Sequence, residues 1–304
     1  MHQSTDIAGY VDEAAAELTG LAAGTPVVCG GGDGICAAVG TGCIKEGIAH
    51  SCMGTSSWIS ITSRKPIFDK EKKTFTWAHI IPGYVLPTGT MQSGGGSYAW
   101  FTRELSGYEE KCAREQNISM YDILEEELSR TAVGSNGLMF LPYLLGERSP
   151  RWNPDAKAGF IGLKMEHERK DMLRAVQEGV AMNLSMVLDT FREYGEKISE
   201  MVVIGGGAKS ATWRRILADV YDVEIQKPNY MDEATSMGAA ITAGVGVGVF
   251  QDFDVIDRFL KIEERIKPVE AHHGAYMELR TLFNKAYEAL VPLFADLSKY
   301  KADI

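Results

Sequence analysis

The stretch from Thr25 to Gly42 most constrains the fold, because an apolar run ends there in glycines around a single acid, TPVVCGGGDGICAAVGTG. This order predicts a buried strand over 26–29, a tight turn and a helix of small residues. Glycines in the turn let a ligand come close to the backbone. Asp33 is therefore a candidate general base, with Gly32 beside it as a substrate contact. The local sequence fits equally well an Asp33 that only caps the helix.

Two further glycine clusters lie at 94–96 and 205–207. The first precedes an aromatic helix, whose N-terminus suits part of a nucleotide, although Trp100 and Phe101 themselves are expected in the core. The second ends an apolar strand over 198–204 and leads into a helix, a βαβ pattern whose strand end is the usual ligand position in an open α/β sheet. Both clusters indicate close approach of the backbone to a ligand.

A hairpin is predicted from the alternating runs 47–51 and 58–62, joined by Gly54, Thr55, Ser56 and Ser57. Amide and hydroxyl donors with little bulk at such a tip suit terminal phosphate oxygens. Gly and Ser also occur in hairpin turns for conformational reasons alone, so the turn by itself does not establish a phosphate site.

Helices are expected where apolar residues recur at helical spacing. The predicted helices are 11–18 with one apolar face, 122–129, 169–194, 233–244, 254–262 and 274–299. The longest, 169–194, keeps its apolar period throughout and should pack along its whole length. The small residues of 233–244 should allow a very close approach to another element. The tandem His272-His273 is expected in a polar loop, and Glu147, Arg148 and Arg151 are expected to pair at the surface.

Charge and cysteine content exclude several classes of function. The net charge of −10 and the pI near 5.2 argue against non-specific binding to nucleic acid or to anionic membranes. No apolar run is long enough to span a membrane and no signal region opens the chain, so a cytoplasmic protein is expected. Five cysteines without CxxC spacing predict reduced thiols, and six histidines without a ligand motif predict no metal site.

Six blocks in order resemble the FGGY family of carbohydrate kinases, and among its branches the xylulokinases. The blocks are GTPVVCGGGDGICAAVG around Asp33, MGTSSW at 53–58, SGGGSYAWF at 93–101, LPYLLGERSPRWNPDAKAGFIGL at 141–163, VVIGGGAKSATWRRILADV at 202–220 and EATSMGAAITAG at 233–244. The resemblance covers essentially the whole chain. It implies an α/β, actin-like (ribonuclease H-like) ATPase fold, a mixed sheet flanked by helices, here as the C-terminal nucleotide-binding half of a two-domain sugar kinase.

The resemblance also implies roles for individual residues. Asp33 would deprotonate the attacking sugar hydroxyl. Phosphate binding would fall to Gly54, Thr55 and Ser56, and nucleotide binding to Gly95, Gly206, Gly207, Ala208 and Ala211. ATP and Mg²⁺ would be the cofactors, and D-xylulose, converted to xylulose 5-phosphate, the expected substrate. Ribulose, gluconate and glycerol stay open as substrates.

One departure from the family is large, because the Asp-x-Gly-Thr phosphate hairpin and most of the sugar-binding domain have no counterpart here. Residues 1–45 are expected to be a remnant of that domain carrying the catalytic Asp33, and residues 46–304 the nucleotide-binding domain. The chain is therefore expected to be inactive alone, and a separate N-terminal half or a second copy is an expected partner.

Two other classes compete with the kinase reading. A non-catalytic module that binds adenine nucleotide fits the missing domain. A nicotinamide-dependent oxidoreductase fits the formal GxGxxA of residues 32–37. Two observations argue against the oxidoreductase. The acid inside the turn would face the pyrophosphate, and no acid lies about twenty residues further on.

Overall fold

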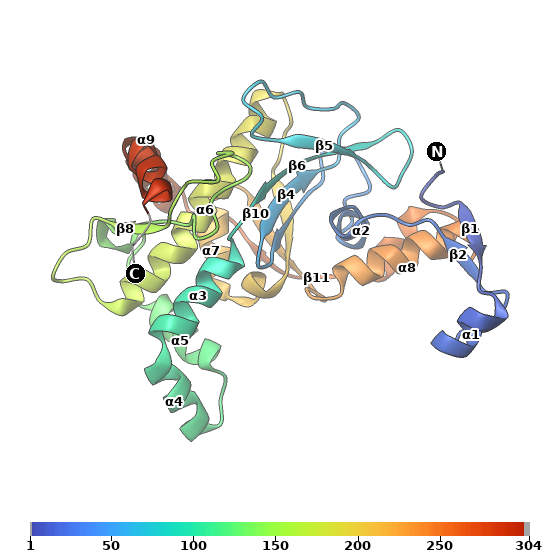
Figure 1. The fold of residues 1–304 in the computed structure, drawn as a ribbon, viewed down its shortest axis with the longest axis horizontal. Helices are drawn as coiled ribbons and strands as arrows, with labels where there is room; N and C mark the ends of the chain where they lie inside the picture. Colours follow the sequence, from blue (N-terminus) through green and yellow to red (C-terminus); the bar gives the residue numbers. More distant parts are fainter. Residues whose placement is uncertain (1, 301–304) are drawn as a thin grey trace.

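A seven-stranded mixed sheet forms the centre of the computed structural model, which describes residues 2–300 (Figure 1). Its strands, in spatial order, are β11 (Ile262–Ile266), β10 (Glu224–Pro228), β9 (Glu200–Ile204), β3 (Ala49–Met53), β4 (Ser57–Ile61), β6 (Val85–Met91) and β5 (Phe75–Ala78). The central strands β10, β9 and β3 run parallel, and the strands on either side pair antiparallel. The α/β class and the mixed sheet flanked by helices are thus confirmed.

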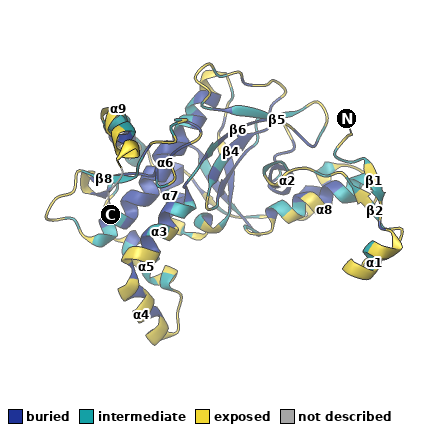
Figure 2. Ribbon diagram, viewed as in Figure 1, coloured by how far each residue is buried: buried dark blue, intermediate teal, exposed yellow. Residues whose placement is uncertain are grey.

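One face of this sheet is covered by α6 (Arg169–Glu193) and α7 (Ala211–Tyr221) (Figure 1). α6 packs against β4 and β6, and Figure 2 shows it buried along most of its length. Met201 and Val203 of β9 belong to this core, as the period-two alternation of a strand requires. The predicted helix over 169–194, packed throughout, is confirmed.

The opposite face is covered by α2 (Asp33–Gly40) and α8 (Ala234–Gly246). The alternate residues of β9, Val202 and Ile204, pack here with Ala37 of α2 and Ala234 of α8. The close approach predicted for the small residues of α8 is confirmed, since α2 lies directly against it. This packing fixes where α2 begins.

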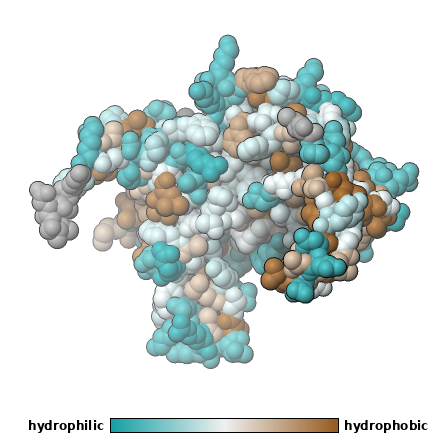
Figure 3. Space-filling model, turned by 45° about the vertical axis from the view of Figure 1, so that its right-hand side comes forward, coloured by the Kyte–Doolittle hydropathy of each residue, from teal (hydrophilic) through white to brown (hydrophobic). Residues whose placement is uncertain are grey.

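Residues 2–28 form a small unit at the far end of α8. β1 (Ile7–Tyr10) pairs antiparallel with β2 (Pro26–Val28), and α1 (Glu13–Thr19) lies between them. The expected apolar face on the first helix is wrong: none of its residues is buried, and Leu18 is 87% exposed. The strand β2 is not fully buried either, because a two-stranded ribbon has too little area to bury both of its faces. Figure 3, which turns this side forward, shows apolar side chains at the surface here.

Aromatic and polar helices surround the end of the sheet that carries the glycine clusters. They are α3 (Gly95–Leu105), α4 (Gly107–Gln116) and α5 (Met120–Ser129), of which α4 is absent from the sequence prediction. A short hairpin of β7 (Met139–Leu141) and β8 (Gly159–Ile161) packs beside α6. Of the two aromatic residues expected in the core, Phe101 is fully buried and Trp100 packs at the edge of the core.

Two predictions near the C-terminal end are wrong. The helix expected over 254–262 is a 3₁₀ turn (Phe253–Arg258), followed by the edge strand β11, whose Ile262 and Ile266 alternate with charged residues. His272 and His273 lie in the first turn of α9 (Glu270–Lys299) rather than in a loop. Their ring Nδ1 atoms hydrogen-bond the side chain and the main chain of the buried Asp219, at 2.9 Å each.

The five cysteines are free thiols, of which Cys36, Cys43 and Cys52 are buried. Burial raises the pKa of Cys43 and Cys52 to about 12. Among the described residues no helix is long and apolar enough to cross a membrane. Within that same part of the chain there is no group of three or more His, Cys, Asp or Glu side chains able to hold a metal ion.

Candidate active site

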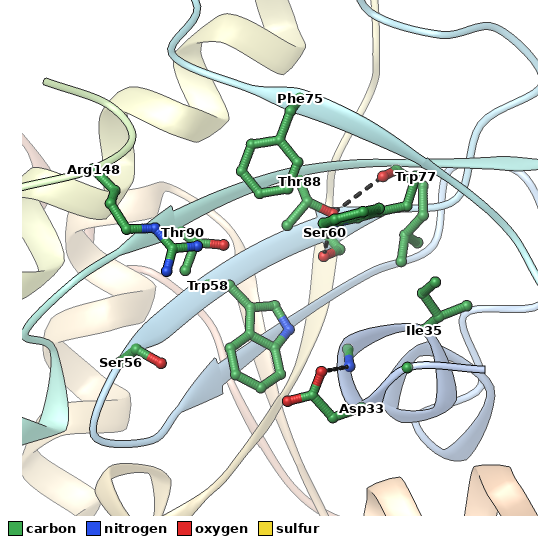
Figure 4. Close-up of a pocket in the computed structure, with 13 residues that line it drawn as sticks. Asp33, Ile35, Ser56, Trp58, Ser60, Phe75, Trp77, Thr88, Thr90 and Arg148 are labelled. Atoms are coloured by element: carbon green, nitrogen blue, oxygen red, sulfur yellow. Dashed lines mark hydrogen bonds between the residues drawn. The ribbon is translucent and has the colours of Figure 1, made fainter. Parts of the chain in front are cut away.

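Asp33 is the first residue of α2 and lines a cavity of about 310 Å³ (Figure 4). The N-cap position is occupied by Gly32, in an extended conformation, so the interpretation of Asp33 as the helix cap is wrong. Asp33 Oδ1 accepts a hydrogen bond of 2.8 Å from Gly34 N. Its Oδ2 has no hydrogen-bond partner among residues 2–300, and the side chain is exposed to the cavity. A negative charge is favourable at this end of a helix, and one side-chain oxygen of Asp33 faces the cavity without a partner in the described residues.

The opposite wall of this cavity, called the Asp33 cavity below, comes from the sheet. Ser60 and Thr88 face it from β4 and β6, with their hydroxyl oxygens 2.9 Å apart. Phe75 and Trp77 of β5 stand edge to face, with ring centroids 5.4 Å apart, and close one side. Hydroxyls beside aromatic rings suit a ligand with both C–H faces and hydroxyl groups. Phe75 and Trp77 point to one face of a strand because they are two residues apart, a sequence signal that could have marked them.

Trp58 lies in the same cavity, next to the start of α2. Its indole Nε1 donates to His50 Nε2 at 3.3 Å, and a Cβ on Gly34 would lie 3.9 Å from the ring. His50 is fully buried; this burial, with a smaller contribution from His79, lowers the pKa of His50 to about 3. Since the ring is therefore neutral, its Nε2 can accept the hydrogen bond from the indole N–H, which holds Trp58 beside Asp33.

The turn between β3 and β4 separates the Asp33 cavity from a second one of about 680 Å³. Ser56 lines the first cavity, whereas Gly54 and Thr55 line the second. The second cavity also has Gly95, Gly206 and Gly207 in its wall, and it is called the glycine cavity below. Because β3 and β9 are parallel neighbours, the turns that follow them meet at one edge of the sheet.

Glycine at the 94–96 turn is required by the closeness of the β3–β4 turn. Gly95 N donates to Gly54 O at 2.8 Å, and Gly96 N donates to Thr55 O at 3.0 Å. A Cβ on Gly94 would lie 2.0 Å from Ser57 Oγ, which no side chain could tolerate. The two turns therefore form one backbone clamp.

The remaining wall of the glycine cavity is aromatic and acidic. Tyr98, Tyr121 and Trp213 line it, as does Glu125, which accepts hydrogen bonds from Ser210 Oγ and Thr212 N at 2.6 Å each. Sequence reasoning missed these residues, because their approach depends on how α3, α5 and α7 pack.

The predicted site residues thus fall into two groups. Gly32, Asp33 and Ser56 line the Asp33 cavity, and Gly54, Thr55, Gly95, Gly206 and Gly207 line the glycine cavity. Ala208 is fully buried, and Ala211 lines a neighbouring, more open depression together with Asp122 and His272. The roles assigned to all of these residues stay predictions.

The charged loop over 145–154 does not contain the surface ion pairs that its sequence predicts. Glu147 is only 4% exposed and accepts hydrogen bonds from Gln92 N, Arg148 N and Asn183 Nδ2 at 2.7, 2.9 and 2.8 Å. Burial, opposed by these three donors, raises the pKa of Glu147 to about 7. Arg151 stacks over Tyr287 instead, with its guanidinium carbon 4.1 Å from the ring centroid. The expected surface pairing of Glu147 with Arg148 and Arg151 is therefore wrong.

Comparison with known proteins places this geometry in context. The C-terminal domain of the FGGY family of carbohydrate kinases matches residues 49–247. A xylulose kinase of Staphylococcus epidermidis is 30% identical over 296 residues, which cover 97% of this chain and 58% of that protein. A gluconokinase of Bacillus licheniformis is 31% identical over 302 residues, covering 99% and 58%. The chain spans about 58% of the length of these relatives.

A solved structure supports the fold. The ligand-bound xylulose kinase from Lactobacillus acidophilus superposes with a TM-score of 0.85 at 24% identity, covering 97% of this chain and 58% of that one. At this identity the likeness establishes the fold, an α/β architecture shared with sugar kinases.

Proposed function

Because this chain belongs to the FGGY family of carbohydrate kinases, we propose that it supplies the nucleotide site and the general base for ATP-dependent phosphorylation of a sugar hydroxyl. One observation carries the proposal: the turn Gly54–Ser56 stands between two cavities, one lined by Asp33 and the other by glycine clusters. A phosphoryl donor in one cavity and an acceptor in the other would meet at this turn.

In this mechanism ATP occupies the glycine cavity. Gly206 and Gly207 lie along the adenosine, and the donors of the Gly54–Ser56 turn hold the terminal phosphate. The sugar occupies the Asp33 cavity, where Asp33 Oδ2 takes the proton of the attacking hydroxyl. The new bond joins the sugar oxygen to the γ-phosphorus, and the bond from that phosphorus to ADP breaks.

No group of three or more candidate ligands occurs within residues 2–300, and Mg²⁺ commonly binds through substrate phosphates with only one or two carboxylates. We propose that Mg²⁺ arrives with ATP, where it neutralises phosphate charge, and we derive no step from it.

D-Xylulose is the proposed sugar, with xylulose 5-phosphate as product. A relative named xylulose kinase and another named gluconokinase match about equally, so gluconate, ribulose and glycerol belong in the same panel. Residues 1–45 are proposed to belong to the sugar side of the cleft and residues 46–304 to the nucleotide side. The second candidate function is a module that binds adenine nucleotide in the glycine cavity without catalysis.

Kinase assays of the wild type and Asp33→Asn test the proposal. We would measure ADP release with each of the four acceptors, using this chain and, where a longer reading frame contains it, that protein. Loss of the base should lower kcat by at least about 10²-fold, while binding of a non-hydrolysable ATP analogue stays unchanged. A rate within about tenfold of wild type would exclude Asp33 as the base. Analogue binding without phosphorylation of any acceptor would favour the non-catalytic module.

A further inference from the structure

Arg148 provides the one guanidinium among the residues that line the Asp33 cavity. Figure 4 shows its side chain directed into the cavity, beside Thr90 and on the same side as Ser56. No hydrogen bond or ion pair to this guanidinium occurs within residues 2–300, although Asp33 lines the same cavity. The residue is exposed, and a guanidinium that lines a cavity without a partner of its own can bind an oxyanion there.

The main chain of Arg148 is held on both sides, so the side chain starts from a fixed position. Its N–H donates to Glu147 Oε1 at 2.9 Å, and its carbonyl accepts from Trp152 N at 2.5 Å. The next residue, Ser149, is fully buried, and its hydroxyl donates to Lys73 O. Gly146 has a positive φ of 70°, and a Cβ there would lie 2.4 Å from Pro154 O, so the loop closes tightly on itself.

Glu147 connects this loop to the backbone clamp at the β3–β4 turn. The oxygen that accepts from Arg148 N also accepts from Gln92 N, at 2.7 Å. Gln92 leads into the 94–96 turn, whose amides donate to Gly54 and Thr55. Glu147 Oε1 therefore accepts hydrogen bonds both from the main chain of Arg148 and from the segment that leads into the backbone clamp.

We propose that Arg148 binds the phosphoryl group on the sugar side of the Gly54–Ser56 turn, and that Glu147 is the residue that positions it. The inference rests on the proposed function. The phosphoryl group moves toward a cavity whose one described acid is Asp33, and like charges repel there. A guanidinium that lines the same cavity as Ser56 offsets that repulsion and stabilises the equatorial oxygens during transfer, with no change in its own protonation.

The same guanidinium chemistry would suit the carboxylate of an acidic sugar. In that case Arg148 would select the acceptor rather than assist transfer. Kinetics with two substrates distinguish the phosphoryl group from the sugar carboxylate as the ligand of Arg148, because D-xylulose has no carboxylate and D-gluconate has one.

The kinetic arm uses this chain and, where a longer reading frame contains it, that protein. It compares Arg148→Ala, Arg148→Lys and the control Arg103→Gln, whose residue lies exposed on α3 beside Glu104. With D-xylulose we expect Arg148→Ala to lower kcat at least 10²-fold with less than a threefold change in KM for ATP. Arg148→Lys should retain more activity, millimolar guanidinium should restore at least fivefold to Arg148→Ala, and Arg103→Gln should match wild type. Unchanged kcat with D-xylulose, alone or with a raised KM for gluconate, would overturn the proposal.

Glu147 is tested by two variants and by circular dichroism to confirm folding. Glu147→Ala should lower kcat about tenfold or more without changing ATP binding, and Glu147→Gln, which keeps one acceptor oxygen, should restore most of it. Equal loss in both variants would contradict positioning through this oxygen.

A binding arm separates failure of this inference from failure of the proposed function. The affinity of this chain for inorganic phosphate in the presence of ADP is measured by calorimetry for wild type and Arg148→Ala. We expect at least tenfold weaker binding in the variant, whether or not any sugar is phosphorylated. Equal affinity, or no phosphate binding by the wild type, would overturn the role of Arg148.

Discussion

Gly40 of α2 and Gly238 of α8 lie against each other with no room for a side chain on either. A Cβ on Gly238 would lie 1.9 Å from Cys36 O, and one on Gly40 would lie 1.8 Å from Ala234 O. The two helices therefore touch through their backbones, and this contact sets the position of the helix that begins with Asp33.

Gly238→Ala should destabilise the protein and disturb the site. The added methyl group overlaps backbone atoms that cannot move alone, and we expect a loss of at least about 2 kcal/mol in the free energy of unfolding. Urea denaturation measures it. The control is Gly274→Ala in α9, where a Cβ meets no atom within 4 Å and where alanine should stabilise by up to about 1 kcal/mol. Similar midpoints for the two variants would contradict the close contact.

Gly206→Val should close the glycine cavity without straining the backbone. Gly206 lines this cavity, and a Cβ there meets no atom within 4 Å, so the branched side chain would project into the space proposed for ATP. We expect at least tenfold weaker binding of an ATP analogue by calorimetry. Gly107→Val, at the exposed start of α4, is the matched control and should bind as wild type does. Unchanged affinity in Gly206→Val would place the nucleotide elsewhere.

His50 should make the protein sensitive to acid. Burial lowers the pKa of His50 from 6.5 to about 3, so between these values the unfolded chain binds a proton that the folded protein does not. Stability is therefore lost as the pH falls below about 6.5, by about 1.4 kcal/mol per unit from this residue. Unfolding of wild type and His50→Gln between pH 7 and pH 5 should differ in slope by about this amount. Parallel curves would show that His50 takes up its proton in the folded state.

Glu147 should act in the opposite direction. Burial raises the pKa of its carboxyl from 4.5 to about 7, even with Arg151 nearby, so the folded protein holds a proton that the unfolded chain releases. Its contribution falls as the pH rises from about 4.5 to 7, by up to about 3 kcal/mol in total. Glu147→Gln removes this titration, so the wild type should lose stability relative to the variant across that range. A constant difference between pH 5 and pH 8 would refute the raised pKa.

Sequence patterns predicted those features that depend on neighbouring residues. The apolar period of 169–194 was sufficient for α6, because a helix face repeats locally. The glycine clusters after apolar runs marked the turns that line both cavities, since a close backbone approach leaves glycine at fixed positions. The family resemblance then connected Asp33 to the turn at Gly54, 21 residues further along the chain.

Local patterns predicted the wrong structure where contacts with residues far away in the chain determine it. The run 254–262 was predicted as one helix, but it forms a 3₁₀ turn and ends at the first residue of β11, an edge strand that pairs with β10. His272 and His273 read as a loop, but the buried Asp219 holds them in the first turn of α9. Glu147 was predicted to be a surface charge, because two of its three donors, Gln92 N and Asn183 Nδ2, come from distant segments that no local pattern brings together.

The sequence by itself determined the kinase family and the turns at which ligands are expected to approach, since both depend on short runs of neighbouring residues. Only the tertiary structure placed Asp33 and Arg148 in one cavity and the glycine clusters in another. The physical reason is that the parallel pairing of β3 with β9 and the glycine contact between α2 and α8 join residues that are far apart in the chain.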